Sequence, residues 1–389
     1  MKNIFLAFVI IFFFSSCKKD DWSAPVSTCN FNEPVNNSHP KALELQSFMD
    51  KYTSIGIPGI SLAIYSDEGF WVGTSGYSKI ENKTPMQPCH LQYSQSVSKT
   101  YMAVAILILK EDGKINLDNK ISDYLPENIS SMVTNSNKVT VRMLLNHTSG
   151  IAEYITDPRY ITYLVQHPFY KFSTLELLKY IDGKPSQFEP GTKYVYTNTN
   201  YELLALIGDF ITGDHAKFIR EEIFQKIGAN NSFYHDNEDY LNKDELVNSY
   251  WDRYSNGAIE NCTEMQKINV ASMIGDDGMI ATPYDYVLFL KALFSEQLIA
   301  DSTLSEMLTF PFIDDEEYGY GLGVHKEIYK DKINYGHSGG GTGAGCYLVY
   351  FPETKTFAFI SINIGTSVYS PIFDNAEKMI DEFYDILIK

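Results

Sequence analysis

Basic residues are scarce in this chain of 389 residues, and arginine occurs only four times. Asp and Glu total 49 against 31 Lys and Arg, which gives a formal net charge of −18 at pH 7. A surface that binds nucleic acid needs clustered positive charge to neutralise phosphates. The composition therefore excludes nucleic acid as a partner.

Cysteine and histidine are also scarce, with five and eight copies. Neither forms a spaced pair of the C-x-x-C or H-E-x-x-H kind that zinc sites use. We therefore expect no metal and no other cofactor. Apart from Cys17, the cysteines are far apart, and their spacing does not select disulfide partners. They are Cys29, Cys89, Cys262 and Cys346.

An apolar run near the N-terminus, residues 4–14, is too short to cross a bilayer as a mature helix. Lys2 precedes this run and Ser15-Ser16-Cys17 follows it. The pattern resembles a bacterial lipoprotein signal, in which cleavage occurs before a cysteine that is then acylated. We expect a signal peptide over 1–16, lipidation of Cys17 and a flexible polar tether over 17–40. The alternative is a plain secretory signal with an incidental cysteine.

The lipid on Cys17 predicts attachment to a membrane. Lys18-Lys19-Asp20-Asp21, directly after the cysteine, is similar to tags that send some lipoproteins to the outer face. The expected location is therefore the cell envelope, as an outer-membrane-anchored lipoprotein that is periplasmic or surface-exposed.

The rest of the chain has the composition of a globular protein, with 44% hydrophobic residues. Alternating apolar residues around turns predict hairpins, and helical periodicity predicts helices, near both ends. The predicted hairpins cover 60–65 with 70–76 and 347–351 with 356–363. The predicted helices cover 97–110 and 372–388. We predict an α+β fold, an α/β sandwich with one antiparallel sheet built from both chain ends and flanked by helices.

The domain boundaries follow from this pattern. Residues 41–389 form one domain, in which a sheet subdomain takes about 41–113 and 270–389. The middle, about 114–269, mixes short helical stretches with loops and is expected to form a mostly helical insertion beside the sheet.

The first chemical motif is Ser96-Val97-Ser98-Lys99, at the start of the predicted helix over 97–110. Positions three apart share a helix face, so the Lys99 amine can lie against the Ser96 oxygen. The helix dipole favours a developing alkoxide at this end, and a desolvated lysine can accept a proton. The same spacing occurs by chance elsewhere, but only Ser96 precedes an apolar helix.

Two further motifs lie downstream. Tyr196-Thr197-Asn198 follows a Pro-Gly turn, and a buried tyrosine beside a lysine cation can serve as a general base. Gly336-His337-Ser338-Gly339-Gly340-Gly341 lies between two predicted strands. Glycines let the backbone approach a ligand closely, and a strand edge offers N–H groups to an oxyanion.

In this order and with their flanks, the motifs resemble the serine β-lactamase/DD-peptidase superfamily. The class C-like branch, in which Tyr-x-Asn replaces Ser-Asp-Asn, is the best match, over about residues 41–389. Framework segments agree as well: 114–127, 139–150, with the sequence Val-Thr-Val-Arg-Met-Leu-Leu-Asn-His-Thr-Ser-Gly, 278–285 and 320–323. The resemblance implies a β-lactamase/transpeptidase-like fold.

The resemblance also implies the roles of the site residues. Ser96 is the acylated nucleophile, Lys99 and Tyr196 share proton transfer, and Asn198 positions the substrate amide or Lys99. His337 and Gly339 belong to the substrate-binding strand in place of Lys-Thr-Gly. The backbone N–H groups of Ser96 and Gly340 would form the oxyanion hole.

One residue departs from the class C β-lactamases, which carry lysine at the position of His337. A histidine near neutrality is a weaker cation for a substrate carboxylate. We therefore expect a D-Ala-D-Ala carboxypeptidase-like or D-amino-acid peptidase or esterase. The partner is a small-molecule or peptide substrate, with peptidoglycan peptides among the candidates, and protonated His337 would assist at mildly acidic pH.

Other interpretations carry less weight. A class C-like β-lactamase and a catalytically silent penicillin- or peptidoglycan-binding protein on the same fold are the alternatives. The segment 336–340 also fits the G-x-S-x-G pattern of α/β-hydrolases, but His337 is the last histidine, so none follows the serine as that fold requires. A dinucleotide-binding loop is disfavoured because a strand, not a helix, follows the glycines.

Overall fold

The computed structural model describes residues 29–237, 239–311, 318–366 and 370–389. The predicted signal peptide and Cys17 lie outside the described residues. Within them, no helix is long and apolar enough to cross a bilayer.

The chain alternates between helices and strands. The helices are α1 (Ala42–Ser54), α2 (Ser98–Glu111), α3 (Glu127–Ser130), α4 (Val141–Leu145), α5 (Pro158–Gln166), α6 (Thr174–Leu178), α7 (Asn198–Thr212), α8 (His215–Ile219), α9 (Thr263–Ala271), α10 (Pro283–Phe294), α11 (Asp301–Met307) and α12 (Phe373–Ile388). Short helical turns are η1 (Gln95–Val97), η2 (Ile121–Asp123) and η3 (Arg220–Gln225). The strands are β1 (Gly59–Ser66), β2 (Gly69–Lys79), β3 (Thr84–Pro85), β4 (Gln92–Tyr93), β5 (Ser232–Tyr234), β6 (Tyr250–Trp251), β7 (Glu260–Asn261), β8 (Met279–Ala281), β9 (Tyr318–Tyr320), β10 (His325–Tyr329), β11 (Lys332–Gly340), β12 (Gly345–Phe351) and β13 (Thr356–Ile362).

One antiparallel sheet forms the centre of the molecule, with strand order β3-β2-β1-β13-β12-β11-β10-β9. The two ends of the chain meet where β1 pairs with β13, with Ile60 opposite Ile362 and Tyr65 opposite Phe357. This confirms the predicted α+β fold with a sheet built from both ends. Both predicted hairpins, β1–β2 and β12–β13, and the predicted C-terminal helix α12 are present.

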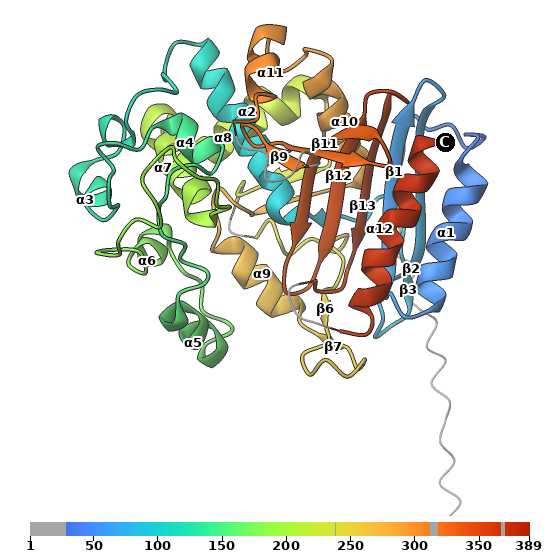
Figure 1. The fold of residues 1–389 in the computed structure, drawn as a ribbon. Helices are drawn as coiled ribbons and strands as arrows, with labels where there is room; N and C mark the ends of the chain where they lie inside the picture. Colours follow the sequence, from blue (N-terminus) through green and yellow to red (C-terminus); the bar gives the residue numbers. More distant parts are fainter. Residues whose placement is uncertain (1–28, 238, 312–317, 367–369) are drawn as a thin grey trace, which may run out of the picture.

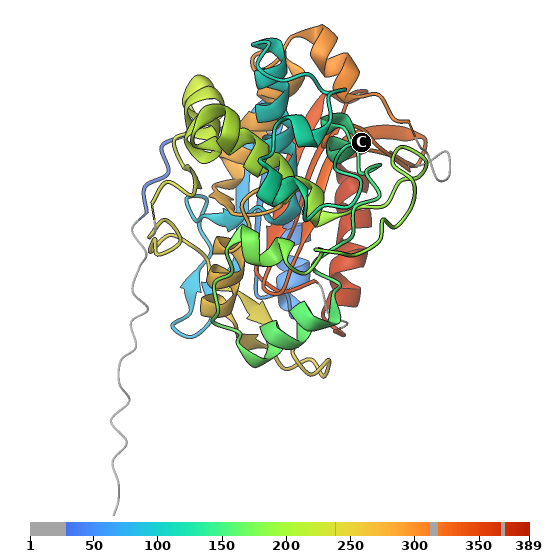
Figure 2. The ribbon, with the colours of Figure 1, turned by 90° about the vertical axis from the view of Figure 1, so that its left-hand side faces the viewer.

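Helices cover both faces of the sheet (Figure 1). α1 and α12 lie side by side on one face and bury a core that includes Phe48, Ile360 and Phe383. α2 and α10 lie on the other face, and the helices α3–α8 extend beyond them. Figure 2, turned by 90°, places those helices in front of the sheet. α2 is therefore buried on all sides, which explains its nearly continuous apolar sequence.

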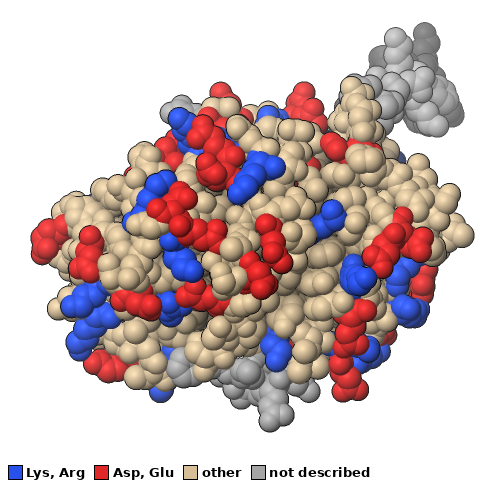
Figure 3. Space-filling view, turned by 90° about the horizontal axis from the view of Figure 1, so that it is seen from above, with Lys and Arg blue, Asp and Glu red and all other residues tan. Residues whose placement is uncertain are grey.

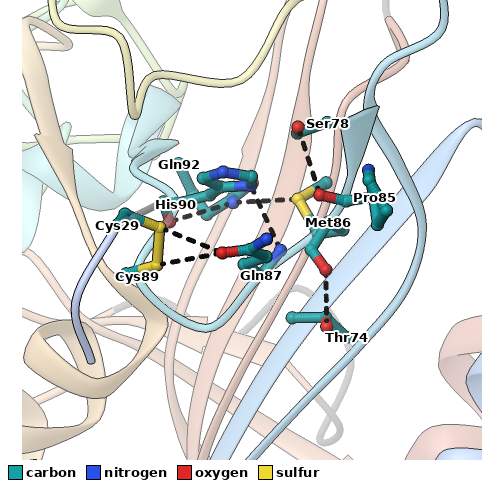
Figure 4. The surroundings of a disulfide bond; sticks show 9 residues. All are labelled: Cys29, Thr74, Ser78, Pro85, Met86, Gln87, Cys89, His90 and Gln92. Atoms are coloured by element: carbon teal, nitrogen blue, oxygen red, sulfur yellow. Dashed lines mark hydrogen bonds between the residues drawn. A yellow bond between two sulfur atoms is a disulfide. The ribbon is translucent and has the colours of Figure 1, made fainter. Parts of the chain in front are cut away.

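A disulfide joins Cys29 to Cys89 and ties the start of the described chain to the loop before β4 (Figure 4). Gln87 Oε1 lies 3.4 Å from the Cys29 sulfur. Cys262 and Cys346 are buried free thiols. The pairing that the sequence left open is thus resolved, and it links segments 60 residues apart.

Charged side chains of both signs are interspersed over the face seen from above (Figure 3). On this face neither sign of charge forms a large separate patch.

Candidate active site

The candidate nucleophile, Ser96, lies in the η1 turn that leads directly into α2. Ser96 is partly exposed, whereas Lys99, one turn later, has 0% exposure. The Lys99 Nζ donates a hydrogen bond to the Ser96 Oγ at 3.0 Å. The predicted geometry of the Ser-x-x-Lys motif is therefore present, with a buried amine against an accessible hydroxyl.

The buried lysine is held by two further groups. Its Nζ donates to the Asp276 backbone carbonyl at 2.9 Å and lies 5.1 Å from the centre of the Tyr196 ring. Burial acts to lower the pKa of Lys99, but Tyr196 and the Asp276 carboxylate outweigh it and raise the pKa above its ordinary value. Lys99 is consequently an ammonium at neutral pH.

Tyr196 lies in the loop before α7 and approaches both Ser96 and Lys99. Its hydroxyl is buried, and burial raises the pKa of Tyr196, although Lys99 and Ser96 act to lower it. At neutral pH the pair thus holds a phenol beside an ammonium. Before either group could accept the Ser96 proton, the pair would have to lose a proton of its own.

Asn198 begins α7, and the structure pairs it with Glu153. The Glu153 Oε2 accepts from the Asn198 backbone N–H at 2.5 Å and from the Asn198 Nδ2 at 3.2 Å. Burial raises the pKa of Glu153. No local pattern in the sequence signals this contact, which fixes the end of the Tyr196 loop.

His147 also contacts the loop that carries Tyr196. Its Nδ1 accepts from the Thr197 N–H at 3.2 Å and contacts the Asn200 Nδ2 at 3.1 Å. Burial, with Lys99 and His325 nearby, lowers the pKa of His147 well below 6.5. His147 therefore holds the loop that carries Tyr196 by hydrogen bonds.

His337 lies in β11, with its ring centre 6.1 Å from that of Tyr196. Its Nδ1 is 2.6 Å from the Ser338 carbonyl oxygen, which can only accept, so this nitrogen carries the proton. The Nε2 is 3.1 Å from the Tyr320 hydroxyl and accepts from it in the neutral ring. Both ring nitrogens are therefore occupied by protein groups.

The charge of His337 follows from its surroundings. Burial, then His325 and Lys99, lowers the pKa of His337 well below 6.5. The rings of His325 and His337 are 4.2 Å apart, so a charge on one would disfavour a charge on the other. The burial of this ring, which the sequence does not reveal, disfavours the protonated His337 on which the expected assistance at mildly acidic pH depends.

Gly339 and Gly340 end β11 beside the nucleophile. Gly339 faces Ser94 and Gln95, because a Cβ at this position would lie 2.7 Å from both the Ser94 carbonyl and the Gln95 Cβ. β10 pairs with β11 only as far as Gly336. Within the described residues, no strand therefore pairs with this edge of β11 from His337 to Gly340.

The structure thus brings Ser96, Lys99, Tyr196 and His337 together, and β11 packs against the η1 turn that carries Ser96. The loop between α9 and β8 supplies the Asp276 carbonyl, which sequence reasoning missed because nothing near Asp276 marks it as a partner of Lys99. The oxyanion role of the Ser96 and Gly340 N–H groups stays a prediction.

Comparison with known proteins finds relatives that are similar in sequence and a solved structure that is similar in fold. The chain is 25% identical over 320 residues to a penicillin-binding protein of Bacillus subtilis (strain 168), covering 78% of this chain and 67% of the relative. It is 22% identical over 232 residues to a putative D-alanyl-D-alanine carboxypeptidase of Escherichia coli (strain K12), covering 56% of this chain. That match spans about half of the relative, 53% of its length.

A solved structure shares the fold. The D-amino acid amidase from Ochrobactrum anthropi SV3, complexed with D-phenylalanine, superposes with a TM-score of 0.77 at 23% identity, over 88% of this chain and 98% of the amidase. The profile of the family described as Beta-lactamase matches residues 45–380, nearly the whole described chain. The chain therefore belongs to the beta-lactamase family of serine hydrolases.

Proposed function

We propose that this chain is an exported hydrolase that forms an acyl-enzyme on Ser96 and cleaves D-amino-acid peptides or amides, with small esters as further substrates. The observation that carries the proposal is the 3.0 Å hydrogen bond between a fully buried Lys99 amine and the partly exposed Ser96 hydroxyl. Once the Lys99–Tyr196 pair has lost one proton, an amine in this position can take the hydroxyl proton as the oxygen attacks.

The reaction follows in two steps. The reactive form of the Lys99–Tyr196 pair has already released one proton to solvent. The Ser96 Oγ bonds to the substrate carbonyl carbon while its proton passes to this form of the pair, and the pair then gives that proton to the leaving amine or alcohol as its bond to the carbonyl carbon breaks. Water next attacks the acyl-enzyme, gives its proton to the same pair and releases the acid. The N–H groups of Ser96 and Gly340 would bind the oxyanion in both steps.

Two features support a peptide-like substrate. The open edge of β11 from His337 to Gly340 suits an extended chain, which can pair with the strand through its backbone. The relatives point to D-configured substrates, since one is named a putative D-alanyl-D-alanine carboxypeptidase and the solved structure is a D-amino acid amidase.

The neutral, fully engaged His337 argues against efficient β-lactam hydrolysis. A β-lactam carboxylate would lose a charge-assisted hydrogen bond of about 1.5–3 kcal/mol relative to a site with lysine, which corresponds to roughly one to two decades in rate. In a panel of penicillin, a D-Ala-D-Ala peptide, a D-amino-acid amide and a p-nitrophenyl ester, we expect measurable kcat/KM for the last three. Penicillin should turn over weakly or only acylate the enzyme.

Efficient penicillin or cephalosporin turnover at pH 7 would contradict this and favour the class C-like β-lactamase. Acylation without turnover of any member of the panel would favour a silent penicillin-binding protein.

For localisation, we propose a lipid anchor on Cys17 that holds the enzyme at the outer membrane, periplasmic or surface-exposed, within reach of peptidoglycan peptides. The Cys29–Cys89 disulfide supports export, because disulfides persist in oxidising compartments. Metabolic labelling with a palmitate analogue should mark the wild-type chain and not Cys17→Ser. An unlabelled, freely released wild-type chain would indicate a plain secretory signal instead.

A further inference from the structure

Gln95, the residue before the candidate nucleophile, has an unusual backbone. Its φ is +46°, a left-handed conformation that costs a residue with a side chain about 1 kcal/mol or more. The side chain is 3% exposed. Such a conformation persists only where the surroundings hold it, so the position of this buried side chain requires an explanation.

The side chain of Gln95 lies against the glycines of β11 and the turn that follows. A Cβ on Gly339 would be 2.7 Å from the Gln95 Cβ, and a Cβ on Gly341 would be 2.8 Å from the Gln95 Cδ. Each distance is too short for a real contact. The Gln95 side chain therefore fills the space that the missing side chains of Gly339 and Gly341 leave, on both sides of Gly340.

The closest contacts of the Gln95 side chain with these glycines are steric. The Gln95 Nε2 has no hydrogen-bond partner among the described residues. The backbone of the same residue is fixed by the Ser98 Oγ, which donates to the Gln95 carbonyl at 3.0 Å. Gln95 thus contacts the first turn of α2 through its backbone carbonyl, and Gly339 and Gly341 through its side chain.

We infer that Gln95 is a positioning residue that sets the distance between the Ser96 N–H and the Gly340 N–H, and so shapes the oxyanion hole. This inference rests on the proposed acyl-enzyme function. Gln95 connects the η1 turn that carries Ser96 to the end of β11 that carries Gly340. A change at Gln95 would therefore affect the transition state more than substrate binding, because the oxyanion forms only in the transition state.

The test uses the full-length chain in detergent and two probes, p-nitrophenyl acetate and the matching thionoester. Sulfur accepts hydrogen bonds poorly, so the ester-to-thionoester ratio of kcat/KM reports how well the oxyanion hole works. We expect Gln95→Ala to lower kcat for the ester about 10- to 100-fold with little change in KM, and to lower the ratio. Gln95→Met, which keeps the length without the amide, should retain near-wild-type values.

Gln266→Ala is the matched control. Gln266 is also fully buried, and its Oε1 accepts from the Gly343 N–H at 3.2 Å, two residues beyond Gly341. Gln266→Ala should leave the ester-to-thionoester ratio of kcat/KM unchanged. Circular dichroism should show that all variants are folded.

Three results would overturn the inference. Wild-type kcat in Gln95→Ala would show that the side chain positions nothing. A loss of kcat with an unchanged ratio would indicate a general structural role, and equal losses in Gln95→Ala and Gln95→Met would indicate an amide contact with the substrate. A wild-type chain that neither cleaves the ester nor reacts with a fluorophosphonate would overturn the proposed function itself, and this inference with it.

Discussion

Replacement of Ser96 by alanine is expected to abolish turnover of every substrate found, with a loss of about 10⁴-fold or more, because no other group can form the acyl-enzyme. The same variant should take no label from a fluorophosphonate. Intact-protein mass spectrometry measures both: the wild-type chain gains one adduct, which peptide mapping places on Ser96, and Ser96→Ala stays at its unmodified mass.

Ser338 provides the control, since it lies in the G-x-S-x-G-like segment of β11. Ser338→Ala should be labelled as fast as the wild type within a few-fold. Label that persists in Ser96→Ala, or that maps to Ser338, would remove Ser96 from the mechanism.

Lys99→Ala and Tyr196→Phe should each lower kcat by roughly 10²–10⁴, the usual range for general acid–base groups. Their combined loss should fall short of the product of the single losses, because the two side chains hold and transfer one proton together. The buried Lys99 amine also holds the Asp276 carbonyl, so Lys99→Ala should show the larger effect of the two.

The pH dependence gives a second readout of the same pair. The pKa values of Lys99 and Tyr196 are both raised, so the deprotonated form that accepts the Ser96 proton is scarce at neutral pH and increases as the pH rises. We expect wild-type kcat/KM to increase from pH 6 to pH 9, and Tyr196→Phe to lose or shift this increase. Tyr254→Phe, a change at a ring that is 66% exposed, is the control and should match the wild type.

A wild-type profile with its maximum at pH 5–6 would contradict the role assigned to the pair. Near-wild-type activity in Tyr196→Phe would leave Lys99 as the proton acceptor by itself.

The elements with strong local patterns could be predicted from the sequence. The two hairpins, α2 and α12 follow from apolar periodicity between turn residues, and the structure contains all of them. The contact of Lys99 with Ser96 was predictable for the same reason, since a step of three residues along the continuous helical backbone of η1 and α2 fixes the distance between the two side chains.

The contacts between distant segments could not be predicted in this way. The pairing of Asn198 with Glu153 and of Lys99 with the Asp276 carbonyl joins loops whose approach depends on the whole fold. The protonation of His337 is another example: the chain shows a histidine, but burial and the neighbouring His325 decide its charge. The left-handed backbone of Gln95 has no sequence signal, because glutamine rarely adopts it.

The pairing of β1 with β13 also determines when the enzyme can become active. β1 is among the first elements to be synthesised and β13 among the last, and β11, which carries Gly339 and Gly340, enters the sheet through β12 and β13. Contacts between such distant segments make folding slow, because a long loop must close before they form. The centre of the sheet is therefore completed only after almost the whole chain has been made. A nascent chain that carries Ser96 but lacks its last strands therefore has no complete sheet to hold Gly339 and Gly340 beside Ser96.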